Sequence, residues 1–290
     1  MSAQQLITAD LRQWIAAQLA QGCSQEQLLA AMQSSGWDAS VAASALAQTL
    51  DPSLVQPMAL GISQAVRDAA AGSPVPEPDL SRGAPLLQIG DRAVRVLLSL
   101  RHPRVVVFGG LLSDEECDAM VAQSEARLAR SETVAAKDSG SEVNAARTSE
   151  GMFFERGENE LIRRIEARLA ALVNWPVDHG EGLQVLRYRP GAEYLPHYDY
   201  FDPAMSSTPA ILKRGGQRVG TLVMYLNTPT AGGATIFPDI GLDVLPVKGN
   251  AVFFSYDRPL PQTLTLHGGA PVREGEKWVA TKWMRQGVFV

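Results

Sequence analysis

The stretch Tyr194-Leu195-Pro196-His197-Tyr198-Asp199-Tyr200-Phe201 decides how the rest of the chain is interpreted. It places an imidazole and a carboxylate two residues apart in a run rich in aromatic residues. Side chains alternate between the two faces of an extended strand, so His197 and Asp199 are predicted to point to the same side. Such a pair can offer one nitrogen and one oxygen ligand to a single metal ion.

A third ligand has to come from elsewhere in the chain. There are four histidines, His102, His179, His197 and His267, and the last lies near the C-terminus in Thr265-Leu266-His267-Gly268-Gly269. Two histidines and one carboxylate that leave coordination positions open are the pattern of non-haem Fe(II) oxygenases. The H-x-D pair alone is a weak signal, because such pairs often arise by chance. We interpret His102 and His179 as surface or structural residues.

Composition and charge narrow the class of protein. The chain has 290 residues, 46% hydrophobic and 20% charged, an ordinary globular composition for about two domains or one large domain with an appendage. Its net charge of −5 gives no basic excess to suggest a nucleic-acid partner. With no apolar run near the roughly 20 residues of a membrane span and no secretory signal, we expect a cytoplasmic protein without a membrane partner. Cys23 and Cys117 are predicted to be free, buried thiols in helices.

Residues 1–50 are predicted to form a small three-helix module, which resembles a ubiquitin-associated-type bundle in outline only. Within it, Ser24 and Gln27 form a capping box that opens the second helix. A packing appendage and a module that docks a protein partner are both open interpretations. Residues 51–85 are rich in Pro, Ala, Gly and Ser and predict a linker, so the main domain is expected over residues 86–290.

After two predicted strands, the main domain continues with helices and ends in many short strands. A capping box at Ser113 and Glu116 predicts one helix, and amphipathic spacing predicts another over residues 161–173. The many short strands that follow favour an α+β domain with a jelly-roll core, a cupin-like double-stranded β-helix, and flanking helices. The predicted strands are 94–98, 104–108, 152–155, 183–189, 194–200, 218–227, 233–237, 243–247, 250–256, 263–267 and 277–285.

Lys277 follows His267 by ten residues, across a turn that contains Gly and Pro. A hairpin there puts Lys277 near the metal but too far along the next strand to ligate it. A lone ammonium that faces inward needs an anionic partner, and a dicarboxylate cosubstrate could chelate iron with one end and pair with the lysine at the other. Lys277, Val279, Thr281 and Trp283 are predicted to share a strand face, so Trp283 can line the same pocket.

Residues 104–290 resemble the prolyl 4-hydroxylase family of 2-oxoglutarate- and Fe(II)-dependent dioxygenases. The matching stretches occur in family order and cover nearly two thirds of the chain, and together they are very specific. They are Arg147-Thr148-Ser149, Glu181–Leu186, Tyr188, Pro196–Phe201, Gly216–Arg218, Met224–Asn227, Gly232–Pro238, Leu266–Gly268 and Gly275–Trp283. One departure is Ala234, which stands where the family commonly has Glu.

The resemblance implies a role for each matching residue. It implies that His197, Asp199 and His267 are the iron ligands. It also implies that Lys277 binds the distal carboxylate of 2-oxoglutarate as part of the catalytic machinery.

The resemblance further implies that Tyr188 and Thr235 help to bind this carboxylate and that Trp283 lies near the cosubstrate. Tyr194 and Arg218 match positions that face the substrate's proline, and Glu181 is expected to contribute there. The loops over residues 134–146 and 201–216 correspond to mobile loops that close over substrate.

The function implied by the resemblance is 4-hydroxylation of a peptidyl proline in an intracellular protein. O2 and 2-oxoglutarate would be consumed and succinate and CO2 released, with ascorbate expected as the reductant that rescues oxidised iron. One alternative keeps this chemistry and changes the substrate to another residue or a small molecule. The other is a non-catalytic peptide-binding or sensor protein that uses residues 1–50 as an adaptor.

Overall fold

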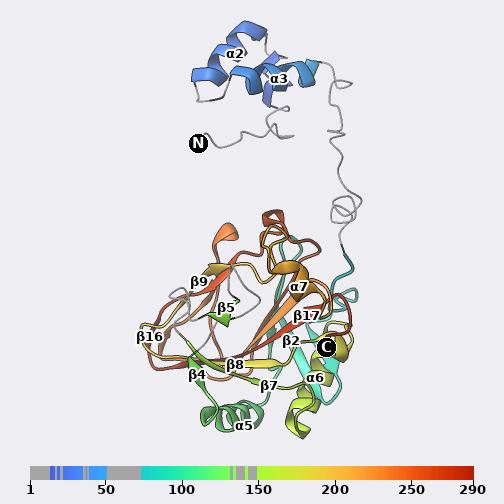
Figure 1. Cartoon of the computed structure of the whole chain (residues 1–290), viewed down its shortest axis with the longest axis vertical. Coiled ribbons are helices and arrows are strands. Elements are labelled where there is room, and N and C mark those ends of the chain that lie inside the picture. The colour runs from blue at the N-terminus through green and yellow to red at the C-terminus, as the bar shows by residue number, and fades with distance from the viewer. Residues whose placement is uncertain are drawn as a thin grey trace. The chain divides into compact units, whose positions relative to one another are not determined.

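The structure is a computed structural model that describes residues 14–16, 18–19, 22–34, 37, 39–50, 73–130, 133–134, 141–142 and 149–290. The chain divides into two compact units, Met1–Ala65 and Val66–Val290 (Figure 1). Over the described ranges, no helix combines the length and the apolar character needed to cross a membrane.

The N-terminal unit contains helices α2 (Gln25–Ser34) and α3 (Ala39–Leu50), which pack side by side (Figure 1). The predicted capping box is present. The Ser24 hydroxyl accepts from the Gln27 N–H at 3.2 Å, and the Gln27 side-chain oxygen accepts from the Ser24 N–H at 2.8 Å. Cys23 is a half-buried free thiol in the segment before α2, not inside a helix as predicted. The core of this unit consists of Ile15, Leu28, Met32, Ala42, Ala45 and Leu46.

The predicted linker extends too far toward the C-terminus, because residues 73–85 lie against the large unit. The Glu77 N–H donates to the Val173 carbonyl at 2.8 Å, and the Glu77 carboxylate pairs with Arg104. Pro76 and Pro78 are buried, whereas Pro74 and Pro85 are exposed, so only part of the proline-rich segment packs on this unit. The earlier part of the predicted linker, up to residue 72, lies outside the described residues.

A nine-stranded antiparallel sheet forms the frame of the large unit. In spatial order its strands are β1 (Leu86–Ile89), β2 (Arg92–Leu100), β3 (Arg104–Gly109), β14 (Ala251–Ser255), β10 (Arg218–Tyr225), β17 (Lys277–Arg285), β8 (Leu183–Tyr188), β7 (Glu150–Phe154) and β4 (Ala129–Arg130). The C-terminal strand β17 thus lies between β10 and β8, near the middle of the sheet.

A four-stranded antiparallel sheet packs against one face of the large sheet. Its strands are β13 (Leu242–Val244), β12 (Thr235–Phe237), β15 (His267–Gly269) and β9 (Tyr194–His197). Two short ladders complete the described strands: β11 (Ala231–Gly232) with β16 (Val272–Glu274), and β5 (Thr133–Val134) with β6 (Ser141–Glu142). Two antiparallel sheets packed face to face, with helices outside, confirm the predicted α+β jelly roll.

Side chains of β17 point alternately to the two faces of the large sheet, and both faces are apolar. Trp278 and Ala280 point toward helices α5 (Asp114–Glu125) and α6 (Glu160–Leu172) and belong to the core between sheet and helices. Val279 points the other way, into a second core shared with β12 and β13 of the small sheet. The helices therefore cover one face, and the space between the two sheets lies on the other.

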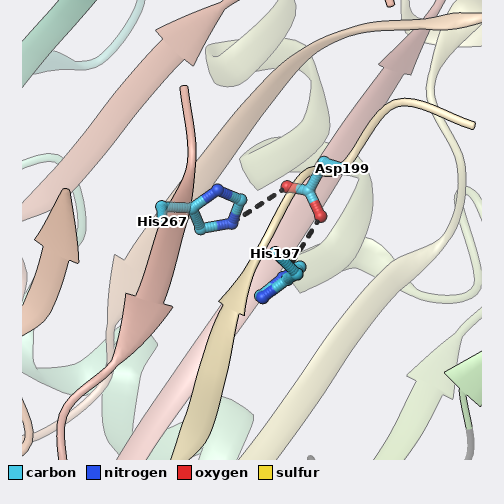
Figure 2. A group of neighbouring side chains, drawn as sticks. All are labelled: His197, Asp199 and His267. Carbon is cyan, nitrogen blue, oxygen red and sulfur yellow. Dashed lines mark ion pairs between the residues drawn. The ribbon is translucent and has the colours of Figure 1, made fainter. Parts of the chain in front are cut away.

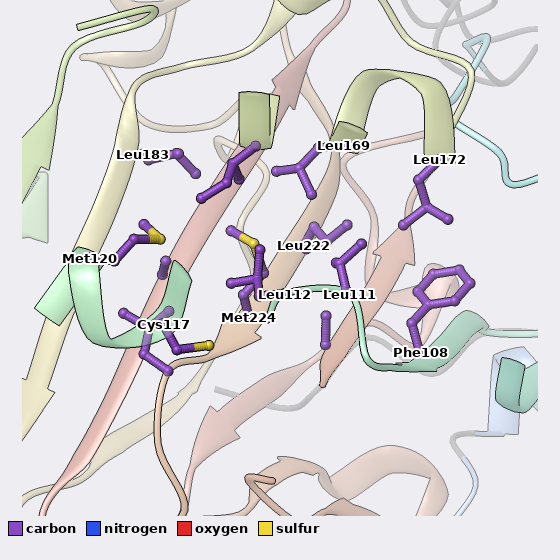
Figure 3. Packing of buried hydrophobic residues seen from close by; sticks show 14 of the residues in the cluster. Phe108, Leu111, Leu112, Cys117, Met120, Leu169, Leu172, Leu183, Leu222 and Met224 are labelled. Carbon is purple, nitrogen blue, oxygen red and sulfur yellow. The ribbon is translucent and has the colours of Figure 1, made fainter. Parts of the chain in front are cut away.

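The two covering helices begin where the sequence predicts. Both bonds of the Ser113–Glu116 capping box are present, and Asn159 caps α6 by accepting from the Ile162 N–H at 3.0 Å. Figure 3 shows side chains of α5 and α6 meeting those of the large sheet. Cys117 in this core is a free, buried thiol as predicted, and burial raises the pKa of its thiol to about 11.

The strands near the predicted metal ligands differ from the strands that the sequence predicts. The strand predicted over residues 194–200 ends at His197, and Asp199 lies in a bend. Of the strand predicted over residues 263–267, only His267 lies in a strand: a 3₁₀ helix over Pro261–Thr263 ends at the start of that range, and β15 begins at His267 after an irregular segment. The reason is Leu264, whose φ of 53° is left-handed and incompatible with an extended strand.

Two loops were expected to be mobile. Of the loop over residues 134–146, positions 135–140 and 143–146 lie outside the described residues, and 141–142 form β6. The segment 201–216 is described and contains helix α7 (Thr208–Leu212), which the sequence did not predict.

A buried charge network ties α6 to α5. The Arg168 guanidinium, 3% exposed as a residue, lies 2.8 Å from the Glu116 carboxylate and 2.9 Å from that of Asp91. Burial alone would raise the pKa of Glu116, but hydrogen bonds from Arg168 and the Ser113 backbone lower it to about 2. Glu116 is therefore ionised at neutral pH, and its charge depends on Arg168.

We expect Arg168→Ala to lower the free energy of unfolding by about 3 kcal/mol, because it leaves the buried Glu116 carboxylate with Arg164 as its only charged partner among the described residues. The control is Arg163→Ala on the same helix, which removes an exposed pair with Glu160 and should cost less than about 1 kcal/mol. Urea denaturation measures both variants. Equal free energies of unfolding for Arg168→Ala and Arg163→Ala would contradict the role assigned to the buried charge network.

Candidate active site

Three side chains that can bind a metal converge between the two sheets. His267 on β15 lies directly opposite His197 on β9 in the antiparallel ladder, and Asp199 follows β9 by two residues. Their ligand atoms all lie within 4.8 Å of one another, and no other group of this kind occurs in the described part of the chain. In Figure 2 the Asp199 carboxylate points toward both imidazoles, with one oxygen 3.7 Å from His197 Nε2 and the other 3.4 Å from His267 Nε2.

Backbone carbonyls orient both imidazoles. His197 Nδ1 lies 2.9 Å from the Leu195 carbonyl, and His267 Nδ1 lies 3.0 Å from the Thr265 carbonyl. A carbonyl oxygen can only accept, so each Nδ1 carries the proton and each Nε2 keeps a free lone pair. Burial, followed by the nearby His267, lowers the pKa of His197 and favours the neutral form that binds metals.

Asp199 supplies the charge of this group. Burial alone would raise its pKa, but His267 and His197 hold that pKa well below its usual value. Thr221 donates to the carboxylate at 2.7 Å, and no Lys or Arg side chain of the described residues bonds to its oxygens. A buried carboxylate beside two imidazole nitrogens is a ligand set for a divalent cation, and these nitrogen and oxygen donors fit Fe(II).

The predicted cosubstrate residues share one narrow cavity with these ligands. Tyr188, Thr235, Lys277 and Trp283 all line it together with the two histidines and Asp199. Val279 and Thr281 line it as well, which confirms that alternate residues of β17 share a face. The cavity lies between the sheets, where strand pairing brings together residues nearly a hundred positions apart.

Lys277 is the buried cation of this cavity. It is 4% exposed, and its ammonium lies over the rings of Tyr188 and Tyr225, 5.5 and 5.9 Å from their centroids. Burial lowers the pKa of this amine to about 8. No acidic side chain lies within ion-pair distance among the residues that the structure describes, so an anion in the cavity would offset the cost of burying the charge.

Tyr225 is a site residue that the sequence did not single out. Its hydroxyl donates to Thr235 Oγ1 at 2.9 Å, which leaves the hydrogen of Thr235 free to bond to a ligand. Burial raises the pKa of Tyr225, so the phenol remains a donor at neutral pH. Tyr225 lies in a predicted strand, but alternation alone does not say which face of that strand meets the cavity.

A larger cleft of about 1260 Å³ opens beside the same ligands. Aromatic rings form part of its wall: Tyr194 stacks on the His197 ring with the centroids 3.7 Å apart, and Tyr198 stacks on Tyr200 with the centroids 4.8 Å apart. The segment 201–216 provides one side of the cleft. Four residues line both this cleft and the narrow cavity, namely Tyr194, His197, Asp199 and Trp283.

Arg218 lines the cleft, and Glu181 holds it in place. Two guanidinium nitrogens of Arg218 donate to the Glu181 carboxylate at 2.7 and 2.9 Å, and the guanidinium carbon lies 4.0 Å from the Trp283 ring centroid. Glu181 was predicted to contribute to substrate contact, but it does not line the cleft. Both its oxygens are occupied by Arg218, so Glu181 acts through that arginine.

Comparison with known proteins agrees with this geometry. Residues 183–285 match the family model of the 2OG-Fe(II) oxygenase superfamily. Probable prolyl 4-hydroxylase 3 of Arabidopsis thaliana is 39% identical over 210 residues, 65% of this chain and 71% of that protein. Prolyl 4-hydroxylase 1 of the same organism is 40% identical over 223 residues, 71% of this chain and 76% of that protein.

Among solved structures, the viral collagen prolyl hydroxylase of Paramecium bursaria Chlorella virus-1, in its 2OG complex, is 31% identical. That match covers 62% of this chain and 94% of the viral protein, with a TM-score of 0.48.

The site and fold define a 2-oxoglutarate- and Fe(II)-dependent dioxygenase. The relatives place the chain more narrowly: it belongs to the prolyl 4-hydroxylase family of these enzymes.

We expect His267→Ala to weaken binding of Co(II), a spectroscopic substitute for Fe(II), by more than the roughly 100-fold that a change outside the ligand shell can cost. His102→Ala, which removes an exposed histidine that does not line either cavity of the site, serves as the control and should bind like wild type. Calorimetric titration measures both variants. Unchanged affinity in His267→Ala would refute the assigned ligand set.

Proposed function

We propose that this chain hydroxylates a proline of a protein or peptide, with 2-oxoglutarate and O2 as cosubstrates. The observation that carries the proposal is the junction of two cavities at His197 and Asp199. One cavity contains the unpaired, buried Lys277 and suits a small dianion. The other is wide, aromatic and open, and it suits a peptide.

The protein's own ligands set where the chemistry occurs. His197, Asp199 and His267 would hold Fe(II) through two Nε2 atoms and one carboxylate, leaving other coordination positions open. When bound, the iron supplies the redox chemistry that couples oxidative decarboxylation of 2-oxoglutarate by O2 to hydroxylation of a substrate C–H bond.

The narrow cavity would orient 2-oxoglutarate. Lys277 would pair with the carboxylate farther from the metal ligands, and the hydroxyls of Thr235 and Tyr188 would bond to the same group. Because Thr235 already accepts from Tyr225, its own hydrogen points to a ligand. Each of these contacts is made by a group buried between the sheets, where little water competes for the charge.

The aromatic cleft would bind the peptide. Aromatic grooves recognise proline-rich segments because flat rings pack on the pre-formed polyproline II helix. Tyr198, Tyr200 and Phe201 provide such a surface, and Arg218 offers hydrogen-bond donors beside it. The relatives named prolyl 4-hydroxylases favour proline over another residue, and the complete ligand set with Lys277 argues against a non-catalytic sensor. Regiochemistry at C4, ascorbate dependence, an intracellular target and a protein partner for residues 1–50 stay predictions.

Binding of 2-oxoglutarate should weaken with rising pH above about 8. The pKa of Lys277 is about 8 in the free enzyme, and pairing with a carboxylate raises it in the complex. The charged amine is therefore fully present only well below pH 8, and above about pH 8 the dissociation constant should rise by about tenfold per pH unit. Calorimetric titration of 2-oxoglutarate into the Mn(II)-loaded enzyme without O2 measures this dependence.

The control for this titration is Lys277→Arg. A guanidinium stays charged across this range, so any residual affinity of the variant should be flat between pH 7 and about 9. If the wild-type dissociation constant for 2-oxoglutarate did not change with pH, Lys277 would not be the group that pairs with its carboxylate.

The proposed activity is tested with a panel of proline-containing peptides. We expect peptide-stimulated release of succinate and the gain of one oxygen on proline, detected by mass spectrometry. The matched control replaces the reactive proline of the best peptide by alanine and should lose both signals. Succinate formation that no peptide stimulates would refute the prolyl assignment, while peptide binding without any turnover would support the sensor alternative.

A further inference from the structure

Asp199 is the one candidate ligand that lies outside a strand, yet it has a defined hydrogen-bond partner in the sheet. Thr221 Oγ1 donates to Asp199 Oδ2 at 2.7 Å, and Tyr256 Oη lies 2.9 Å from the same Thr221 oxygen. All three side chains are buried. They form a continuous chain of hydroxyls that ends on the carboxylate.

The direction of the two hydrogen bonds follows from the number of hydrogens. An ionised carboxylate can only accept, so the single hydroxyl hydrogen of Thr221 is used on Asp199. Thr221 Oγ1 must then accept from Tyr256, whose phenol donates. Burial and the nearby charge of Asp199 raise the pKa of Tyr256 well above its usual value, so the phenol keeps this hydrogen at neutral pH.

The two hydroxyls are held by central strands of the large sheet. Thr221 lies on β10 and is flanked by Phe254 of β14 and Trp283 of β17 in the ladders on either side. Tyr256 follows β14 directly, and its backbone N–H donates to the Val219 carbonyl at 3.1 Å. A hydroxyl of the large sheet therefore holds Asp199, which lies in the bend after β9 of the small sheet.

Each ligand of the group thus has its own orienting contact. Carbonyls of Leu195 and Thr265 hold the two imidazoles, and Thr221 performs the corresponding task for the carboxylate. A hydrogen bond to Oδ2 limits rotation of the carboxylate and uses one of its lone pairs. Outer contacts of this kind direct a ligand toward a metal and tune its donor strength.

We propose that Thr221 and Tyr256 are positioning residues that hold Asp199 in its metal-binding orientation, with Tyr256 acting through Thr221. The inference rests on the proposed function, because it takes the group of His197, Asp199 and His267 as the metal site. It predicts that two hydroxyls beyond the ligands control how tightly and in what geometry the metal is held.

The test is Co(II) titration of the full chain, followed by calorimetry and by the visible spectrum of the bound ion. Thr221→Val keeps the branched shape and removes the hydroxyl, and we expect it to weaken Co(II) binding by about 10- to 100-fold and to alter the spectrum. Thr221→Ser restores the hydroxyl and should return both properties close to wild type. Tyr256→Phe should have a smaller effect of the same sign.

Coupling between the two sites provides a second readout. If Tyr256 acts only through Thr221, the double variant Thr221→Val, Tyr256→Phe should bind Co(II) no more weakly than Thr221→Val alone. Losses of Co(II) affinity that add in the double variant would refute the proposal that Tyr256 acts through Thr221. This comparison distinguishes a hydroxyl relay from two independent packing defects.

The control is Ser124→Ala, which deletes a buried hydroxyl of α5 that bonds to the Met120 carbonyl. It should lower the thermal stability of the metal-free protein without changing Co(II) affinity. Wild-type affinity and spectrum in Thr221→Val would overturn the inference and leave the metal site intact. Absence of Co(II) binding by the wild-type protein would overturn the proposed function and the inference with it. Should Thr221→Val fail to fold, Tyr256→Phe still decides, because wild-type Co(II) affinity in that variant would overturn the proposal.

Discussion

The site depends on the register of β17, a strand buried on both faces along its whole length. Its odd-numbered residues face the space between the sheets, and its even-numbered residues face the helices. A slip by one residue would place Trp278 in the cavity and Lys277 against α5 and α6, because the side-chain period of a strand is two. Pairing with β8 and β10 on either side excludes that slip, since each neighbour has the same two-faced pattern.

Two lysines on this strand illustrate how the structure separates a structural charge from a functional one. Lys282 points toward α6 and pairs with Glu166 at 2.6 Å, so its charge is balanced within the protein. Lys277 points the other way and has no acidic partner among the described residues. Burying both charges is costly, and only the first is compensated by the chain itself. An unbalanced, buried ammonium is therefore the more informative of the two about function.

The Asp199 carboxylate is the negative counterpart of Lys277 in this cavity. Asp199 lies beside two imidazoles, Lys277 lies over two aromatic rings, and the two charged groups do not pair with each other. A divalent cation would balance the charge of Asp199, and a dicarboxylate would balance that of Lys277. The cavity thus contains one buried carboxylate and one buried ammonium that do not pair with each other, and a dicarboxylate that chelates a bound metal at one end could pair with Lys277 at the other. Arg218, clamped by Glu181, keeps a further positive charge at the border of the peptide cleft.

The sequence by itself determined the chemistry of the site: which residues can bind a metal, which lysine follows them, and which periodicities build strands and helices. It also identified the family, because short motifs in a fixed order carry that information. The strand bounds predicted from the sequence were wrong where the backbone conformation departs from the extended strand. Leu264 in a left-handed conformation moves the start of β15 to His267, and Asp199 lies in a bend beyond the end of β9.

Only the tertiary structure decided which groups act together. The ladder that sets His267 opposite His197 joins positions seventy residues apart, and no local pattern encodes that pairing. The same holds for Tyr225 beside Thr235 and for the hydroxyls of Thr221 and Tyr256 beneath Asp199. Strand alternation says that a side chain faces one of two sides. Which side meets the cavity depends on how the two sheets pack, and that is a property of the whole fold.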